Sequence, residues 1–470
     1  MDFSNHGSAS GGVVFLFQAA IKCCGLGYFW KSLWKALLNA METKNSNSPS
    51  RRTFIKQAAW IAGMPAIIPA SVLGRNGDTA PSNKIVLGAI GIGPRGREVL
   101  KEFLSQSDVQ FVAVADVQET RREIVRKTAN RQYGNEDCKA YRDMHEVLAR
   151  TDIDAVLIAT GDRWHAPASM IAARAGKDVY SEKPCTMTIG ECKELDDTIL
   201  KEKRIFQAGT QRRNVDNFRL AVELARTGQL GKLKTLHAGI ITPENDMPNL
   251  PGEDEPDPKL IDWDRWLGPS AMRPYNKRYV EGQWRGQEGL AAGYKILEWG
   301  SHTVDLCQWA ADADGTTPIE FEAEGGTIRA TYANGIKLVM RIAGFENEGD
   351  WLDLGTCPVR FEGETGWVEA GDHAKILASD PGLLAKHKIE DLPGTNPIKH
   401  VRNFLDCVKS REQPTCNSTV TRYGHVACHA AALSWKLGRK LKLDPVTEMF
   451  IGDEEANKMR VTERRAPWNV

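Results

Sequence analysis

Residues 84–96 have the sequence Lys84-Ile85-Val86-Leu87-Gly88-Ala89-Ile90-Gly91-Ile92-Gly93-Pro94-Arg95-Gly96. The run up to Ile90 is mostly apolar and rich in β-branched residues, which is typical of a buried parallel strand. A Gly-x-Gly-x-x-Gly motif follows directly, and apolar residues at helical spacing come after it, between 99 and 104. A strand, this motif and a helix in succession predict a turn that binds a dinucleotide, with the pyrophosphate at the helix N-terminus.

The three motif glycines are expected to have separate roles. Gly91 permits the tight turn, Gly93 lets the backbone approach a pyrophosphate, and Gly96 lets the helix pack closely on the strand. The motif alone is a weak signal, but here the strand and the helix flank it in the required order.

An acidic residue completes the motif. A second apolar strand, 109–115, ends at Asp116, about 20 residues beyond the last glycine. A carboxylate at this place accepts hydrogen bonds from the adenosine ribose and repels a 2′-phosphate. We therefore expect NAD in preference to NADP. The nearby Arg121 and Arg122 weaken this preference, because either could neutralise a 2′-phosphate.

Two further strand–helix units follow. Strands at 154–160 and 178–181 alternate with helical patterns. Such alternation predicts an α/β Rossmann domain with a doubly wound parallel sheet, which we place at 81–208. His165 and Lys183 follow these two strands and so lie at carboxyl ends, where such sheets bind ligands. His165 either lines the nicotinamide pocket or caps the helix after it.

Residues 1–80 are expected to be a leader, with the mature chain starting near 71–81. The run Ser50-Arg51-Arg52-Thr53-Phe54-Ile55-Lys56 has the form of a twin-arginine export signal, and a weakly apolar segment, 58–70, follows it. The twin-arginine route carries folded proteins, often with a cofactor inside. We therefore expect a periplasmic or otherwise exported redox protein. Met41 is a plausible true start.

Charge and cysteine content argue against several classes of function. Lys and Arg total 61, as do Asp and Glu, so nothing indicates binding to nucleic acid or to an anionic membrane. The ten cysteines include no Cys-x-x-Cys pair, so we expect no metal site and mostly buried, reduced thiols. No stretch has the length of a membrane span, about 20 apolar residues, so no membrane insertion is expected once the signal is removed.

Four stretches along the chain form a recognisable set. They are Glu182-Lys183-Pro184, Gly209-Thr210-Gln211-Arg212-Arg213, Trp263-Asp264-Arg265-Trp266-Leu267-Gly268-Pro269 and Trp299-Gly300-Ser301-His302-Thr303-Val304-Asp305. The set resembles the glucose–fructose oxidoreductase / inositol dehydrogenase / MocA (Gfo/Idh/MocA) family, in its twin-arginine-exported subgroup, over 84–440. The resemblance implies a second, α+β domain at 209–445, with an open, mostly antiparallel sheet that often mediates dimers or tetramers.

The sequence supports such a sheet independently. Strand patterns flank Asn334-Gly335, and Asn-Gly is a strong hairpin signal. The expected strands and the two amphipathic helices after them are 232–241, 327–332, 336–342, 398–410 and 421–437. Only a polar tail is expected at 446–470.

The resemblance also implies the reacting groups. In the family the lysine of Glu-Lys-Pro, here Lys183, reaches the nicotinamide ribose and the reacting hydroxyl, and the peptide before Pro184 is cis. An acid and a histidine in an Asp-x-x-x-His pattern handle the substrate alcohol, and here Glu298 and His302 match it, with Glu in place of Asp. Four residues apart on a helix, they share one face. Asp305, one turn further, is expected to orient His302.

A hydride leaves a carbinol carbon only as the hydroxyl proton is removed. His302 is the expected base, and Lys183 is expected to stabilise the alkoxide. Gln211, Arg213 and Tyr294 are expected to bind substrate, although Gln211 and Arg213 could instead hold the domain junction. The residues expected to contact the cofactor are Gly91, Ile92, Gly93, Arg95, Gly96, Asp116, Thr160, Trp164, His165, Glu182 and Lys183.

These features predict an exported NAD(P)-dependent oxidoreductase that transfers hydride between a sugar or cyclitol carbon and a tightly held cofactor. Trp164, Trp284 and Trp299 are candidates for stacking on a sugar. An alternative is a redox-neutral glycosidase or epimerase that acts through a transient keto-sugar, since NAD-dependent glycosidases need no pair of carboxylates. A third alternative is a binding protein on a retired dehydrogenase scaffold, which the presence of Lys183 and His302 disfavours.

Overall fold

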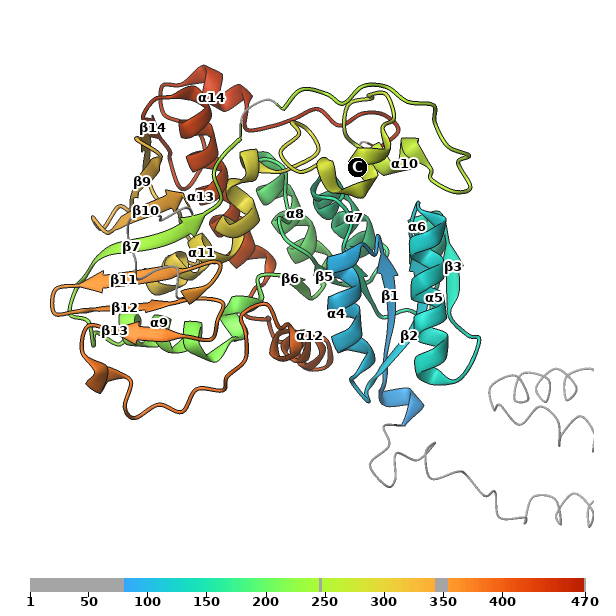
Figure 1. The fold of residues 1–470 in the computed structure, drawn as a ribbon, viewed down its shortest axis with the longest axis horizontal. Coiled ribbons are helices and arrows are strands. Elements are labelled where there is room, and N and C mark those ends of the chain that lie inside the picture. Colours follow the sequence, from blue (N-terminus) through green and yellow to red (C-terminus); the bar gives the residue numbers. More distant parts are fainter. Residues whose placement is uncertain (1–79, 245–246, 343–353, 469–470) are drawn as a thin grey trace, which may run out of the picture. The chain divides into compact units, whose positions relative to one another are not determined.

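The computed structural model describes residues 80–244, 247–342 and 354–468 (Figure 1). All of these residues belong to one compact unit. The predicted leader, with its twin-arginine motif at 50–56, lies outside the described residues. Within the described ranges, no helix is both long enough and apolar enough to cross a membrane.

A sheet of six parallel strands confirms the predicted doubly wound domain. Its strand order is β3-β2-β1-β4-β5-β6. The strands are β1 (Ile85–Ile90), β2 (Val109–Ala115), β3 (Lys139–Tyr141), β4 (Ala155–Ile158), β5 (Asp178–Ser181) and β6 (Phe206–Ala208). The helices are α4 (Pro94–Leu104), α5 (Glu119–Tyr133), α6 (Met144–Leu148), α7 (Asp162–Arg174) and α8 (Ile189–Glu202). From β1 to β3 each new strand is added on one side of the sheet, and from β4 to β6 on the other side. The change of side occurs between β1 and β4, and ligands bind to such sheets at this switch point.

A second sheet of eight strands is mostly antiparallel, as expected. Its order is β13-β12-β11-β7-β10-β9-β8-β14, and only β7 and β10 pair in parallel. The strands are β7 (Leu233–Ile240), β8 (Glu320–Glu324), β9 (Thr327–Thr331), β10 (Lys337–Ile342), β11 (Val359–Gly363), β12 (Trp367–Ala370), β13 (Ile376–Ala378) and β14 (Leu441–Lys442). The predicted hairpin joins β9 to β10, and Gly335 in its turn has a φ of 89°.

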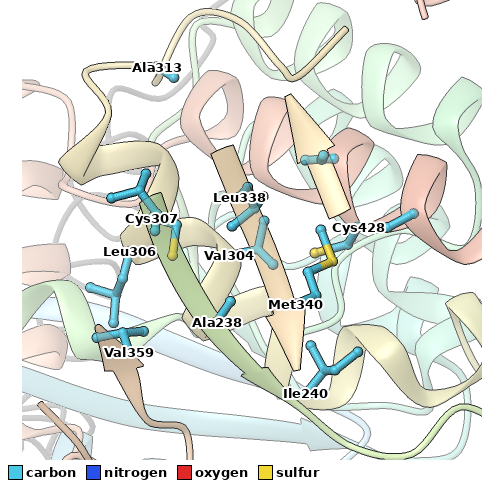
Figure 2. Close-up of a cluster of buried hydrophobic side chains, with 14 of the residues drawn as sticks. Ala238, Ile240, Val304, Leu306, Cys307, Ala313, Leu338, Met340, Val359 and Cys428 are labelled. Atoms are coloured by element: carbon cyan, nitrogen blue, oxygen red, sulfur yellow. The ribbon is translucent and has the colours of Figure 1, made fainter. Parts of the chain in front are cut away.

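Helices from distant parts of the chain bury the apolar side chains of the second sheet. They are α9 (Asp216–Arg226), α11 (Ile296–Ala310) and α13 (Ser418–Leu437). Figure 2 shows the centre of this core, where Val304 of α11 lies among Ala238 of β7, Met340 of β10 and Cys428 of α13. The helix α12 (Ile398–Ser410) packs instead in the core of the first sheet, through Phe404. Both predicted late helices are thus present, and α11 packs between β7 and α13.

The last described segment differs from the expected polar tail. Leu443 forms an antiparallel bridge with Phe450, whose side chain is 2% exposed, and α14 (Glu454–Lys458) follows. Ala456 of α14 is also buried in the second core. Single apolar residues within a polar sequence produce no periodic pattern, so this packing left no sequence signal.

Short elements connect these parts. They are η1 (Pro81–Asn83), η2 (Gln211–Asn214), α10 (Trp263–Leu267), η3 (Tyr279–Gln283), η4 (Gly293–Lys295) and η6 (Pro381–Leu383). In α10 the rings of Trp263 and Trp266 stack with centroids 4.7 Å apart and form a small aromatic core. The eight cysteines of the described ranges are unpaired and buried, in agreement with the expected reduced thiols.

Candidate active site

Two glycines let β1 and α4 approach the end of β4. Gly91 has a φ of +66°, and a Cβ atom added to it would lie 2.3 Å from Cγ2 of Thr160. A Cβ atom on Gly96 would lie 2.8 Å from Cβ of Ala159. Both contacts are too close for real side chains, so any larger residue would displace the loop or the helix.

The N-terminus of α4 is open. Its N-cap is Gly93, and the next residue, Pro94, has no N–H to satisfy. The nearest atom to a Cβ on Gly93 would be Nη1 of Arg121, 3.6 Å away. The loop therefore combines space, a helix N-terminus and a nearby cation, which together suit a pyrophosphate.

Asp116 ties the end of β2 to the glycine loop. Its Oδ2 accepts the backbone N–H of Ile92 and its Oδ1 that of Gln118, both at 2.8 Å. Burial raises the pKa of Asp116, and Arg121 opposes this shift. Each carboxylate oxygen has a further lone pair, so Asp116 can still accept a ribose hydroxyl.

A cavity of about 450 Å³, the first cavity, lies over the glycine loop. Of the residues expected to contact the cofactor, it is lined by Gly91, Gly93, Arg95, Gly96, Asp116, Thr160 and Trp164. Ile92 does not line it, because its side chain is buried in the core and only its N–H serves the loop. Lining residues that sequence reasoning missed include Gln118, Arg163, Trp266, Arg285 and Trp468.

A second cavity of about 400 Å³ adjoins the first. The two cavities share the lining residues Arg95, Glu98, Ala159, Thr160, Trp284 and Arg285. Besides Arg95 and Thr160, six more residues predicted for the site line the second cavity, namely His165, Glu182, Lys183, Gln211, Glu298 and His302. The fold therefore brings together residues from the ends of β4 and β5, from η2 and from α11.

Lys183 joins the first domain to the helix α11. Its Nζ donates a hydrogen bond to the backbone carbonyl oxygen of Glu298, 2.7 Å away. Burial lowers the pKa of Lys183, while the carboxylate of Glu182 acts in the opposite direction. The Lys183–Pro184 peptide is cis, as expected.

His302 and Glu298 present unpaired polar atoms to the buried region around the second cavity. His302 is 3% exposed, and its Nδ1 has no hydrogen-bond partner among the described residues. Burial lowers the pKa of His302 well below the ordinary value, and Arg212 and Lys183 add to the shift. Oε1 of Glu298 is likewise buried without a partner there. His302 is therefore uncharged at neutral pH and able to accept a proton.

His165 lines the second cavity rather than capping α7. Its Nδ1 lies 2.6 Å from the carbonyl oxygen of Pro184 and must carry the hydrogen, since a carbonyl oxygen only accepts. Burial lowers the pKa of His165 to about 4, so the ring is neutral and its Nε2 is an acceptor. Within the described chain this Nε2 has no partner.

Arg95 connects the two cavities to the second domain. Its Nε lies 3.4 Å from Oε1 of Glu182, and its Nη1 donates to the carbonyl oxygen of Thr395 at 3.3 Å. The side-chain amide of Gln211 is oriented so that its nitrogen donates to the carbonyl oxygen of Gly209 and its oxygen accepts a hydrogen bond from Nη2 of Arg95, at 3.1 Å. A further bond between domains runs from the N–H of Ala292 to Oδ2 of Asp162, at 3.0 Å. Gln211 thus both lines the second cavity and holds the junction.

Asp305 and Arg213 do not take the places expected for them. Arg213 donates from Nε to Oδ2 of Asp305 at 2.7 Å and from Nη2 to its Oδ1 at 2.9 Å. Its Nη2 also bonds Asp314 at 2.7 Å. Asp305 therefore binds Arg213 and makes no hydrogen bond to His302 in the described structure, and neither residue lines the second cavity. These bonds join η2 to α11 and to Asp314 within the second domain, so they support neither of the two roles considered for Arg213.

Tyr294 is also turned away from both cavities. It lies in η4 with a φ of 50°, and its ring centroid is 5.9 Å from that of Trp435 on α13. Nζ of Lys436 lies 5.2 Å from the same ring. The left-handed backbone at Tyr294 directs its side chain onto α13, so its placement does not support the predicted substrate contact.

The charged residues of the second cavity that were not predicted include Arg212 and Asp162. Arg212 binds Asp372 through Nε at 2.7 Å and Nη2 at 2.5 Å, and its Nη1 is buried with no partner among the described residues. Burial raises the pKa of Asp162, the first residue of α7, to about 6. Trp284 and Trp299, which were expected to stack on a sugar, line the second cavity as well. Arg212 lay within a quoted motif, but the sequence did not show which of its two arginines faces the cavity.

Two family models match the chain. Residues 85–210 match the oxidoreductase family, NAD-binding Rossmann fold, and residues 249–470 match the oxidoreductase family, C-terminal alpha/beta domain. Both models belong to the Gfo/Idh/MocA group.

Named relatives are similar to the chain over part of their length. A myo-inositol 2-dehydrogenase from Thermotoga maritima is 31% identical over 147 residues, and a glycosyl hydrolase family 109 protein from Stenotrophomonas maltophilia is 30% identical over 198 residues. These matches cover 31% and 39% of this chain, and the chain spans only 42% of the length of each relative.

A solved structure shows the same fold. The myo-inositol 2-dehydrogenase from Lactobacillus plantarum superposes with a TM-score of 0.55 at 17% identity, over 77% of this chain and 100% of that one. Both domains are thus found together in a known structure. The chain belongs to the Gfo/Idh/MocA family of oxidoreductases, and its first domain is that family's NAD-binding Rossmann domain.

Proposed function

We propose that the protein transfers a hydride between a hydroxyl-bearing carbon of a sugar or cyclitol and a nicotinamide cofactor. The observation that carries this proposal is the convergence of Lys183, Glu298 and His302 on the second cavity, which adjoins the first and shares lining residues with it. A substrate in the second cavity would lie next to a dinucleotide in the first.

The first cavity fits a dinucleotide. The open helix N-terminus at Gly93 and the space above it suit the pyrophosphate, and Asp116 suits the adenosine ribose. We propose NAD rather than NADP, because the carboxylate of Asp116 would repel a 2′-phosphate. When bound, the nicotinamide ring accepts or returns the hydride, and the protein supplies the positioning and the proton transfer.

The roles of the reacting residues follow from their charges. Burial depresses the pKa of His302 and keeps its imidazole neutral, and a neutral imidazole has one ring nitrogen whose lone pair would take the hydroxyl proton of the substrate. The ammonium of Lys183, fixed by Glu298, would stabilise negative charge that develops on the same oxygen. Glu298 Oε1, which has no partner within the described residues, would accept a second hydroxyl.

The unpaired atoms around the second cavity favour a polyhydroxylated substrate. Nη1 of Arg212 is a donor, whereas Oε1 of Glu298 and Nε2 of His165 are acceptors. Mixed donors and acceptors match hydroxyl groups, which both donate and accept. Trp284 and Trp299 add apolar surface for the faces of the ring. The inositol dehydrogenases among the relatives are consistent with such a substrate.

A redox-neutral glycosidase is the second candidate. Family 109 glycosyl hydrolases are among the relatives, and such a reaction would begin with the same hydride transfer. It also needs a further proton donor or acceptor, and Asp162, whose pKa burial raises to about 6, lines the second cavity. Release of aglycone from a glycoside, with no net change in cofactor redox state, would favour this candidate over net oxidation.

We also propose export by the twin-arginine route and a cofactor that stays bound through turnover. The motif at 50–56 supports export, and free nicotinamide nucleotide should be scarce outside the cytosol. Assembly into dimers or tetramers through the second sheet is proposed by analogy with the family, and light scattering of the purified protein tests it.

The first experiment is to purify the protein without added nucleotide, denature it, and identify what is released by chromatography and absorbance near 340 nm. Near-stoichiometric NAD or NADH is expected. The loaded protein is then screened against sugars, cyclitols and glycosides for a change at 340 nm and for aglycone release. Recovery of NADP would contradict the role given to Asp116. A protein that neither contains nor binds a nicotinamide nucleotide would refute the proposed function.

A further inference from the structure

The segment 460–468 leaves α14 and crosses to the first domain (Figure 1). Nη2 of Arg464 pairs with Oε2 of Glu194 at 2.6 Å and with Oε1 of Glu191 at 3.2 Å. Both carboxylates belong to α8 of the first domain. These ion pairs anchor the middle of the 460–468 segment to the Rossmann domain.

A second anchor holds the segment beside α10. The N–H of Arg465 donates to the carbonyl oxygen of Pro269 at 2.9 Å, and its Nε donates to that of Ser270 at 3.1 Å. Its Nη1 pairs with Asp264 at 2.7 Å. Arg465 itself does not line the first cavity. The residues after it are thereby directed toward that cavity.

Trp468 forms part of the wall of the first cavity. The backbone N–H of Trp468 donates a hydrogen bond to the carbonyl oxygen of Arg465 at 2.8 Å. Its ring lies edge-on to that of Trp164, with the ring centroids 5.5 Å apart. The indole Nε1 is buried and has no acceptor in the described ranges. Buried indole N–H groups usually have an acceptor, so this one is available to a bound molecule.

The surroundings of Trp468 identify which end of the first cavity it covers. Cζ of Arg265 lies 6.0 Å from the centroid of the Trp468 ring, and Nη2 of Arg265 donates to Oδ2 of Asp143, two residues after β3, at 3.0 Å. Trp468 does not line the second cavity, where Lys183 lies. In doubly wound domains the adenosine lies toward the β2 side of the sheet and the reacting ring at the opposite end. Trp468 therefore stands at the adenosine end.

We propose that Trp468 is a cofactor-contacting residue, which covers the adenosine half of the dinucleotide and donates its indole N–H to it. The 460–468 segment then retards cofactor release, because the nucleotide cannot leave past Trp468 without losing these contacts. This inference rests on the proposed function, since it requires a dinucleotide in the first cavity. A purely structural Trp468 would instead stabilise the protein equally with and without nucleotide.

The test measures NADH release rather than turnover. Wild type and variants are loaded with NADH and mixed with excess NAD, and the loss of NADH fluorescence gives the release rate. Trp468→Ala removes the aromatic side chain, and Trp468→Phe keeps one aromatic ring but removes the N–H with the five-membered ring. Arg465→Ala loosens the segment without changing a residue of the cavity wall. Trp367→Phe, in β12 of the second sheet, is the matched control. Melting temperatures without nucleotide are recorded for each protein.

Release from Trp468→Ala is expected to be about 10- to 100-fold faster, the range found when a ring stacked on a base is truncated. Trp468→Phe should release NADH roughly fivefold faster, as for one lost hydrogen bond, with an unchanged melting temperature. Arg465→Ala should also accelerate release, and Trp367→Phe should not.

Wild-type release rates in both Trp468 variants would overturn the inference while leaving the proposed function intact. If Trp468→Ala does not fold, Trp468→Phe decides alone. A wild-type protein that binds no NADH would overturn the inference and the proposed function together.

Discussion

Lys183 donates a hydrogen bond from Nζ to the carbonyl oxygen of Glu298, at 2.7 Å and across 115 residues of sequence. The acceptor belongs to the first turn of α11, and His302 lies one turn further along the same helix. One contact therefore sets the distance between the cation that would stabilise an alkoxide and the base that would take the proton. The geometry of the reacting groups depends on the junction of the two domains.

Replacement of this lysine should separate binding from chemistry. Lys183→Met is expected to lower kcat by on the order of 10²- to 10³-fold, because it removes a preorganised charge beside the reacting oxygen. Cofactor affinity, measured by NADH fluorescence titration, should fall far less than kcat, since the variant loses one expected contact to the nicotinamide ribose and keeps the glycine loop. A variant whose kcat stays within tenfold of wild type would contradict the role given to Lys183.

Gly91 and Gly134 form a matched pair for testing the dinucleotide loop. Their φ angles are +66° and +65°, but a Cβ on Gly91 would collide with Thr160, whereas the space around Gly134 is open. Both alanine variants should lose about 1–2 kcal/mol of unfolding free energy through left-handed strain. Only Gly91→Ala should also lose NAD binding, which calorimetry can measure. Equal NAD affinity in the two variants would exclude the loop as the pyrophosphate site.

The adjacent arginines of η2 should differ in their effects. Arg213→Lys is expected to lower the unfolding free energy by about 2–3 kcal/mol, because hydrogen bonds to charged groups are lost from a buried ion pair. Its KM should stay near the wild-type value. Arg212→Lys should raise KM about tenfold or more, since Nη1 faces the second cavity region unpaired. Because Arg212 also forms a buried ion pair, with Asp372, urea unfolding should show a loss of stability in both variants, and steady-state kinetics distinguish them. A raised KM for Arg213→Lys alone would reverse the assignment.

Acid should destabilise the protein through its buried histidines. Burial lowers the pKa of His429 to about 3, and His425 adds to the shift. Between pH 6.5 and 3 the unfolded chain binds a proton at His429 and the folded chain does not. Its contribution to the unfolding free energy therefore falls by about 1.4 kcal/mol per pH unit as the pH decreases.

The variant His429→Gln isolates this effect. Urea unfolding at pH 7, 6, 5 and 4 should give a shallower loss of stability for the variant than for wild type below pH 6.5, and parallel curves above it. Asp162 and Asp305, whose pKa values burial raises to about 6, oppose the trend in both proteins and cancel in the comparison. Parallel curves down to pH 4 would show that His429 titrates normally.

Local pattern was sufficient for the fold and for part of the site. The apolar run before Gly91, the glycine spacing and Asp116 are adjacent features with steric causes, so the strand–turn–helix unit was predicted from sequence. Residues that end parallel strands must meet at one edge, which is why Lys183 and His165 were placed near each other.

Contacts between residues far apart in sequence determine the side-chain positions that the sequence did not predict. Asp305 shares a helix face with His302, but Arg213 arrives from η2 and takes both of its oxygens. Tyr294 is redirected by a left-handed backbone that the sequence around it does not demand. Trp468 lies in a polar stretch with no periodicity, and only the folded chain brings it to the first cavity. Each of these positions depends on a partner far away in sequence.

Hydrogen bonds that join the domains around the second cavity include three, from Lys183 to Glu298, from Ala292 to Asp162 and from Arg95 to Thr395. Hinge motion that widened this gap would break all three together, at a cost of about 1 kcal/mol or more for each. We therefore expect an opened form, with the two domains separated at the second cavity, to be a minor species beside the one described.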